Sequence, residues 1–255
     1  MTVDHWLFRV MRTLKLTIEY DGGRYLGWQV QPKGLTLQGV LEEKLSYLTG
    51  EKIALLGSGR TDAGVHALGQ VAHFKTRCEL DALTIQRALN SLLPSDILIQ
   101  NVEEVDEGFH ARRNSKSKIY EYRILNRPLR SVFQRGTAWH IPQSLNLAEM
   151  KKATRSLLGE HDFSSFQSVG SPKKTAVRRV TRAEWRQSRD GFLLFEIEAN
   201  GFLKQMVRAI VGTLVEVGKG RISCEEFQKI LESRDRKKAG PTAPARGLFL
   251  QAVKY

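Results

Sequence analysis

The chain has 255 residues, of which 41% are hydrophobic, and its formal net charge is +13. A chain of this length and composition buries a sizeable core, which excludes the disordered class. No apolar run approaches the roughly 20 residues that cross a membrane, and the N-terminal stretch lacks a signal-peptide core. We therefore expect a cytoplasmic, globular protein.

The excess positive charge lies in the second half of the chain. Residues 1–113 carry 13 Lys and Arg against 14 Asp and Glu, whereas residues 114–255 carry 27 against 13, a net charge of +14. A solvated basic face would account for this distribution. So much charge on one half nevertheless favours a polyanionic partner, and RNA or DNA is the commonest.

The first half alternates strand and helix patterns. Apolar residues alternate with polar ones in strands, and they recur at a spacing of three or four residues in helices. The patterns predict strands at 14–21, 51–57, 69–76 and 96–105, and helices at 36–50 and 81–93. The order is β-α-β-β-α-β.

The second half repeats this order with one extra helix. The patterns predict strands at 117–125, 175–187, 191–200 and 247–255, and helices at 145–159, 202–218 and 223–234. A hairpin is expected about SRDG at 188–191. We therefore predict an α+β fold of two ferredoxin-like or RRM-like halves, at 11–113 and 114–255, each an antiparallel sheet backed by helices. Two such halves facing each other would make a cleft between them, where we expect any active site to lie.

The densest polar motif is GSGRTDAGVHALGQVAHF at 57–74, which places Arg60, Asp62 and His66 among four glycines. Glycines permit unusual backbone torsions and close approach of another chain. Asp62 is therefore expected in a short turn at a sheet end, within a cleft. An ordinary Asx-turn would also explain an aspartate in such a loop. Neither a Walker A loop nor a dinucleotide fingerprint is present.

Five ordered blocks, together with this motif, resemble the tRNA pseudouridine synthase A family. They are YDGGRYLGWQ (20–29) with TLQGVLE (36–42), FHARRNSKSKIYEYRI (109–124), GEHDFSSF (159–166), NGFLKQMVRAIVGTLVEVGKG (200–220) and APARGLFLQAVKY (243–255). The blocks run from about Met11 to the end, so residues 1–10 are interpreted as an N-terminal extension; the alternative is that Met11 is the true initiator.

The resemblance implies a cofactor-free isomerase of tRNA. Such enzymes detach uracil from its ribose, rotate it and rejoin it through C5, at positions 38 to 40 of the anticodon stem-loop. The essential carboxylate of the family corresponds to Asp62. Addition to the base, attack on the sugar and abstraction of a sugar proton all remain open as its role. The resemblance also implies a homodimer.

Two residues of the second half are further catalytic candidates. Arg208 stands in a mostly apolar helix, where an unpaired guanidinium would be costly. The resemblance pairs it with Asp62, while an ion pair with Glu196 or Glu198 is the alternative. Tyr120 corresponds to the tyrosine that stacks on the target uracil and takes part in proton transfer, although a core tyrosine is the commoner case.

The remaining candidates concern substrate binding. The resemblance gives Arg60 the role of helping to extrude the target nucleotide, and Leu248 a place in the base pocket. The alternatives are a phosphate contact or a salt bridge for Arg60, and a plain core residue for Leu248. We interpret His66 as a turn or RNA-contact residue. The phosphate-contact candidates on the basic loop are Lys173, Lys174, Arg178 and Arg179.

Two other classes of function compete with the isomerase. A non-catalytic RNA-binding protein would fit two RRM-like halves, but no RNP1-like run is present. A nucleoside or glycoside hydrolase could use Asp62, but glycosidases generally need a second carboxylate across the bond, and none stands out near the motif. The two histidine-ligand spacings HxH and HxxxH and the CxxC spacing are absent, so we expect no metal.

Overall fold

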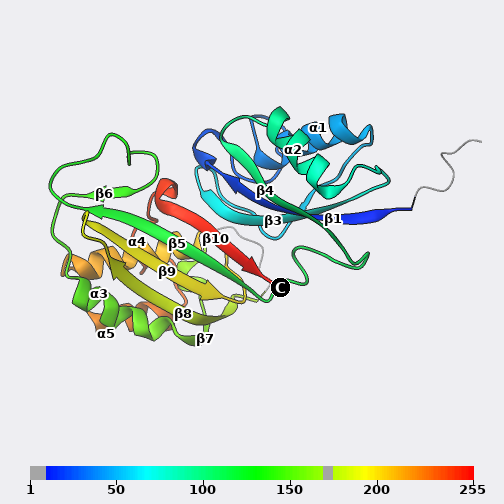
Figure 1. Cartoon of the computed structure of the whole chain (residues 1–255). Coiled ribbons are helices and arrows are strands. Elements are labelled where there is room, and N and C mark those ends of the chain that lie inside the picture. The colour runs from blue at the N-terminus through cyan, green and yellow to red at the C-terminus, as the bar shows by residue number, and fades with distance from the viewer. Residues whose placement is uncertain (1–9, 169–174) are drawn as a thin grey trace, which may run out of the picture. The chain divides into compact units, whose positions relative to one another are not determined.

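The computed structural model describes residues 10–168 and 175–255. The chain divides into two compact units (Figure 1). Unit 1 runs to Ser115 and includes the last residue, Tyr255, while unit 2 spans Lys116–Lys254. The functional domains expected at 11–113 and 114–255 stay a prediction.

Unit 1 is an antiparallel sheet with two helices on one face (Figure 1). The sheet order is β4-β1-β3, and β2 pairs with β3. In chain order the elements are β1 (Arg12–Tyr20), η2 (Gly22–Arg24), α1 (Leu37–Thr49), β2 (Leu56–Gly57), β3 (His66–Thr76), α2 (Ala82–Leu92) and β4 (Ile97–Val105).

The helices of unit 1 begin at residues whose side chains cap them. The side chain of Thr36 accepts a hydrogen bond from the backbone of Gly39 at the start of α1, and Asp81 accepts one from Thr84 at the start of α2. Such caps satisfy N–H groups that have no partner within the helix. The core combines alternate residues of β1 with one stripe of each helix: Leu14, Leu16, Ile18, Leu41, Leu45, Ile85 and Leu89 are all fully buried.

Unit 2 is a larger antiparallel sheet covered on one face by three helices (Figure 1). The sheet order is β10-β5-β9-β8-β7, and β6 adds to β5 as a parallel strand. In chain order the elements are β5 (Ser117–Asn126), β6 (Trp139–Ile141), α3 (Leu147–Thr154), η3 (Arg155–Leu157), β7 (Gly159–Asp162), η4 (Ser164–Phe166), β8 (Val177–Gln187), β9 (Phe192–Ala199), α4 (Met206–Gly218), α5 (Cys224–Ser233), η5 (Ala245–Gly247) and β10 (Leu248–Lys254).

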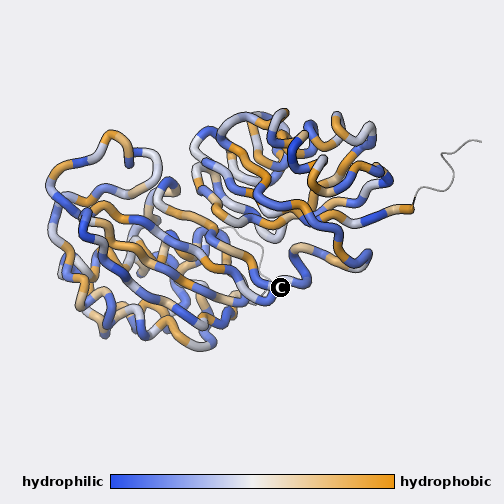
Figure 2. Tube along the Cα trace, in the orientation of Figure 1, coloured by the Kyte–Doolittle hydropathy of each residue, from blue (hydrophilic) through white to orange (hydrophobic). Residues whose placement is uncertain are grey.

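Helix α4 is the central helix of unit 2. Nearly all its residues are buried, which is typical of a core helix that is apolar all round. Half-buried and buried residues alternate along β9, and Figure 2 displays the hydropathy of the residues along the trace. The inward-facing residues of β9 are Leu193, Phe195, Ile197 and Ala199.

The predicted α+β class, with antiparallel strands backed by helices in each unit, is confirmed, whereas three details of the prediction are wrong. The strand expected at 51–57 is only β2, because side chains of α1 take its backbone donors: Glu42 accepts from Leu55 N–H (2.8 Å) and Ser46 from Ile53 N–H (3.0 Å). The short strands β6 and β7 were not predicted. The helix expected from 202 begins at Met206.

No helix within the described parts of the chain is long and apolar enough to cross a membrane.

Candidate active site

Asp62 lies on a tight turn of unit 1 between β2 and β3. The backbone N–H of Val65 donates to the Asp62 carbonyl oxygen (3.1 Å) and closes the turn, in which Gly64 has a φ of 76°. Glycine adopts this torsion without steric cost. The Asp62 residue itself is half-buried. A carboxylate on a fixed turn is therefore available to a substrate.

The segment 20–29 holds this turn in place. The hydroxyl groups of Tyr20 and Thr61 are hydrogen-bonded at 2.9 Å, and Trp28 N–H donates to the Thr61 carbonyl (3.1 Å). A Cβ atom on Gly27 would lie 2.6 Å from that same carbonyl oxygen. The segments 20–29 and 61–65 thus pack backbone against backbone, which fixes the backbone that carries Asp62.

Buried polar residues brace the other end of the turn. The hydroxyl of Ser58 donates to Gln70 Oε1 (2.8 Å), and Gln70 Nε2 donates to the Gly59 carbonyl (3.0 Å). Ser58 and Gln70 are both fully buried. Burial raises the pKa of Tyr20 above its usual range, so its hydroxyl stays neutral. The sequence reasoning missed Tyr20, Trp28 and Gln70 as supports, because only long-range contacts reveal them.

Arg60 and His66 occupy different environments. Arg60 is exposed, and its Nε donates to Gln29 Oε1 (3.0 Å). His66 is 2% exposed; its Nδ1 accepts from Gly22 N–H (3.2 Å) and lies 3.0 Å from Asp21 Oδ1. The ring therefore joins β3 to η2. A contact of His66 with RNA would require the ring to leave this position, and that role stays a prediction.

Tyr120 and Leu248 share one face of the sheet of unit 2. In the register of β5 and β10, Tyr120 is opposite Leu250 and Tyr122 is opposite Leu248. Residues two apart on a strand point to the same face, so Tyr120 and Leu248 are diagonal neighbours. Both are mostly buried, and the Tyr120 ring meets the Phe202 ring edge-on at 5.0 Å.

Arg208, on α4, is tied to the segment that leads into β10. Its Nε donates to the Ala243 carbonyl (2.8 Å), and Ala243 N–H donates to the Arg208 carbonyl (3.0 Å). The hydroxyl of Tyr122 donates to the Pro244 carbonyl (2.7 Å). Burial raises the pKa of Tyr122, and the positive charges of Arg208 and Arg246 oppose that rise. Unit 2 thus gathers Tyr120, Arg208 and Leu248 around residues 243–248.

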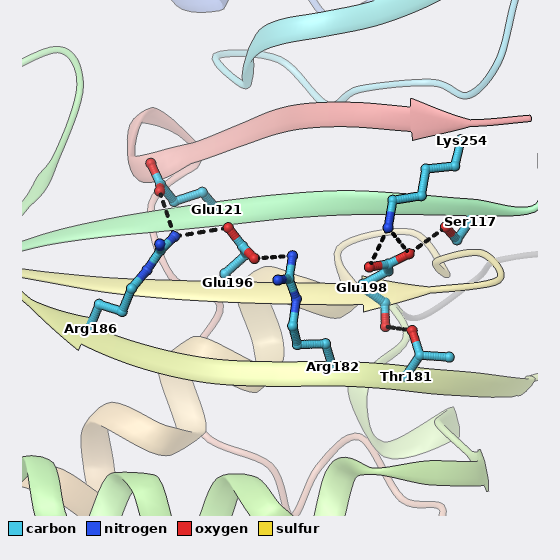
Figure 3. Close-up of polar contacts among 8 residues, drawn as sticks. All are labelled: Ser117, Glu121, Thr181, Arg182, Arg186, Glu196, Glu198 and Lys254. Atoms are coloured by element: carbon cyan, nitrogen blue, oxygen red, sulfur yellow. Dashed lines mark hydrogen bonds and ion pairs between the residues drawn. The ribbon is translucent and has the colours of Figure 1, made fainter.

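The two carboxylates offered as alternative partners of Arg208 are engaged elsewhere, on the strands shown in Figure 3. Glu196 pairs with Arg182 and with Arg186 (2.9 Å). Glu198 pairs with Lys254 (2.8 Å) and accepts a hydrogen bond from Ser117 (2.6 Å). Both carboxylates alternate along β9 with its inward-facing residues, so they lie on the face away from the helices. The ion pair of Arg208 with Asp62 stays a prediction.

The basic-loop candidates are only partly described. Lys173 and Lys174 lie outside the described residues. Arg178 is half-buried, and its guanidinium donates to the carbonyl groups of Thr175 (2.9 Å) and Val177 (2.6 Å), while burial lowers its pKa. Arg179 is exposed. Within the described ranges, no group of three or more His, Cys, Asp or Glu side chains is placed to hold a metal ion.

The family model for tRNA pseudouridine synthase matches residues 16–112 and 153–255. The chain belongs to the tRNA pseudouridine synthase family. The resemblance seen in the sequence blocks is thereby confirmed. Members of this family are isomerases that convert uridine to pseudouridine in tRNA.

Individual relatives agree over nearly the whole chain. A tRNA pseudouridine synthase A of Thermoanaerobacter sp. (strain X514) is 48% identical over 96% of this chain and 100% of its own length. That of Moorella thermoacetica (strain ATCC 39073 / JCM 9320) is 48% identical with the same coverage. Among solved structures, a chain of a Cbf5-Nop10-Gar1 complex matches with a TM-score of 0.36 and 15% identity, over 79% of this chain and 45% of that one.

Proposed function

We propose that this chain converts uridine to pseudouridine at positions 38, 39 and 40 of the anticodon stem-loop of tRNA, with Asp62 as the catalytic carboxylate. The observation that carries the proposal is the turn at 62–65, which presents a half-buried carboxylate from a backbone braced on both sides. An enzyme stabilises a transition state with groups that are already held in position before the reaction, and a carboxylate on such a turn is a group of this kind.

The other candidates take roles around that carboxylate. Arg208 pairs with Asp62, Tyr120 stacks on the extruded uracil, Leu248 lines the base pocket and Arg60 fills the space that the base leaves. The clustering of Tyr120, Arg208 and Leu248 around residues 243–248 supports a common task.

The reaction is balanced without a cofactor. The bond from N1 of uracil to C1′ of ribose breaks, a bond from C5 to C1′ forms, C5 loses its proton to solvent and N1 gains one. Loss of the C5 hydrogen is therefore obligatory for the isomerisation. Simple binding, or hydrolysis of the glycosidic bond, leaves that hydrogen in place.

Tritium release from tRNA labelled at C5 of uridine tests the proposal. Wild type should release tritium, and Asp62→Ala and Asp62→Asn should not. Asp106→Asn, which alters an exposed carboxylate of the same unit, should match wild type. Because catalysis and docking use different residues, Asp62→Asn should keep its tRNA affinity within about tenfold. Loss of both activity and binding would show that Asp62 is structural.

Two further measurements distinguish the competing functions. Free uracil without tritium release would identify a hydrolase, and tight binding with neither product would identify a non-catalytic RNA-binding protein. Substrates with a single uridine at 38, 39 or 40 test the position. Release from a tRNA whose uridines all lie outside these positions would contradict the anticodon assignment.

We also propose that the protein is a cytoplasmic homodimer. One protomer would then dock the body of the tRNA while its partner acts on the stem-loop. Light scattering of the purified protein measures the mass directly, and a mass near that of one 28.9 kDa chain would contradict the dimer.

A further inference from the structure

The loop between β5 and β6, residues 127–138, exposes apolar side chains among arginines. Leu129 is 79% exposed, Val132 60% and Phe133 91%. The loop reads RPLRSVFQRGTA, with arginines at 127, 130 and 135 and no acidic residue. Figure 1 shows it projecting beyond the end of β5, and Figure 2 displays its mixed hydropathy. An exposed aromatic residue in a cationic loop is a common mark of a binding surface.

The loop holds its exposed side chains outward with its own hydrogen bonds. Arg127 Nε donates to the Leu129 carbonyl (3.0 Å), and Arg135 Nη1 donates to the Val132 carbonyl (2.7 Å). Ala138 N–H donates to the Gln134 carbonyl (3.1 Å). These hydrogen bonds constrain the loop backbone, which reduces the conformational entropy that is lost when a partner binds.

The base of the loop is joined to the candidate site. Arg246 Nε donates to the Ala138 carbonyl (3.3 Å), and Arg246 stands in η5, directly before Leu248 and β10. The Trp139 ring, at the start of β6, meets the Tyr122 ring edge-on at 6.3 Å. The base of the loop therefore lies beside Tyr122 and beside the segment that leads into Leu248.

The charge of the loop decides which partner it fits. Among residues 10–168 and 175–255, no carboxylate forms an ion pair with Arg127, Arg130 or Arg135. Two copies of the loop would repel each other, whereas phosphate groups would be attracted. A fully exposed phenyl ring stacks on a base only where that base is unpaired, since paired bases are already stacked in a helix.

We propose that the β5–β6 loop docks unpaired nucleotides of the tRNA, with Phe133 stacking on a base and the arginines contacting the adjoining phosphates. The proposal rests on the proposed function, because it takes tRNA as the substrate. It adds a docking element outside the residues that surround the target uridine. Its contribution is to tRNA affinity and placement, and the chemical step does not use it.

The test compares tRNA affinity across matched variants of the full chain. Phe133→Ala should raise the Kd for tRNA between about fivefold and a hundredfold, the range found when one stacked base is lost. Phe133→Tyr should restore most of the affinity, and Phe133→Leu should not. Tyr47→Ala removes an aromatic side chain that is 77% exposed on α1, and it should bind like wild type. Thermal unfolding should be unchanged, because Phe133 has no core contacts to lose.

A second comparison identifies the ligand as an unpaired base. The Phe133→Ala defect should appear with tRNA and vanish with a blunt RNA duplex of similar length. Arg130→Ala should weaken both ligands and lower the salt slope of binding by about one. A Phe133→Ala protein that binds tRNA like Tyr47→Ala overturns the inference, as does a variant whose only change is a lower oligomeric mass. If wild type neither binds nor modifies tRNA, the proposed function fails as well, so the two failures are distinguishable.

Discussion

At Gly212, helix α4 approaches the chain that leads into β10 more closely than a methyl group would allow. A Cβ atom there would lie 1.7 Å from the Pro241 carbonyl oxygen. Gly212 lies one turn after Arg208 on α4, and the Pro241 carbonyl occupies the space that a side chain at this position would need. The contact fixes the segment 241–248, which carries the hydrogen-bond partner of Arg208 and ends at Leu248.

Gly212→Ala should therefore impair both stability and catalysis. Overpacking a fixed backbone contact costs about 1–3 kcal/mol in the free energy of unfolding, and the displaced segment would move Leu248 and Ala243 away from Arg208. Urea unfolding measures the first effect and tritium release the second. Gly108→Ala, where no atom lies within 4 Å of the new methyl group, is the control and should match wild type. Full activity in Gly212→Ala would show that the segment has freedom to shift.

Some residues of the candidate site could be predicted from the sequence, and others could not. The turn at Asp62 was readable, because a short, polar, glycine-rich stretch between two apolar strands is a typical turn signal. The partners that hold it, Tyr20 and Gln70, were not, since each joins the turn only through tertiary hydrogen bonds. The alternative partners of Arg208 were also undecidable from spacing. Only the strand register shows that Glu196 and Glu198 face Arg182, Arg186 and Lys254.

Strand β3 carries a buried histidine whose titration should make stability depend on pH. His73 is 4% exposed, and its Nδ1 accepts from Ala111 N–H (3.2 Å), which joins the strand to the turn at 109–114. Burial lowers the pKa of His73, the charges of His110 and Lys75 act in the same direction, and a backbone hydrogen bond to Leu56 opposes them. The folded state thus favours the neutral ring.

The sign of the pH effect follows from that lowered pKa. Between the folded-state pKa and the usual value near 6.5, the unfolded chain binds the proton more readily than the folded protein does. The contribution of His73 to the unfolding free energy is therefore fully present above pH 6.5 and falls as the pH drops below it. The loss of unfolding free energy between pH 7.5 and pH 5.5 should be larger in wild type than in His73→Asn, which keeps an acceptor near Nδ1 but does not titrate. Equal losses in the two proteins would exclude His73 as the source.

Elements with strong local signals were predicted, and those fixed by tertiary contacts were not. The helices α1, α2 and α5 have caps and apolar stripes in their own sequence. Strands β6 and β7 have three and four residues, too few for a period to be seen. They form because the end of β5 at 124–126, which β10 does not reach, and the outer edge of β8 are open to pairing. Residues 53–55 looked like a strand, but α1 side chains satisfy their donors instead.

The whole molecule carries its charge unevenly, and this should dominate the salt dependence of tRNA binding. Residues 114–255 hold a net charge of +14 and residues 1–113 a net charge of −1. Each phosphate neutralised by a lysine or arginine releases a condensed counterion, so log Kd rises linearly with log salt concentration. If four or more phosphates are contacted, the Kd should rise about a hundredfold between 50 and 200 mM NaCl.

Filter binding across that salt range measures the slope, and thermal unfolding over the same range controls for changes in the fold. The slope also separates the two parts of the proposed recognition. In a plot of log Kd against log salt concentration, Phe133→Ala should raise Kd equally at every salt concentration, because stacking releases no counterion. Arg130→Ala should instead reduce the slope of the plot. A line that is flat for wild type would mean that the charge of residues 114–255 serves some purpose other than holding RNA.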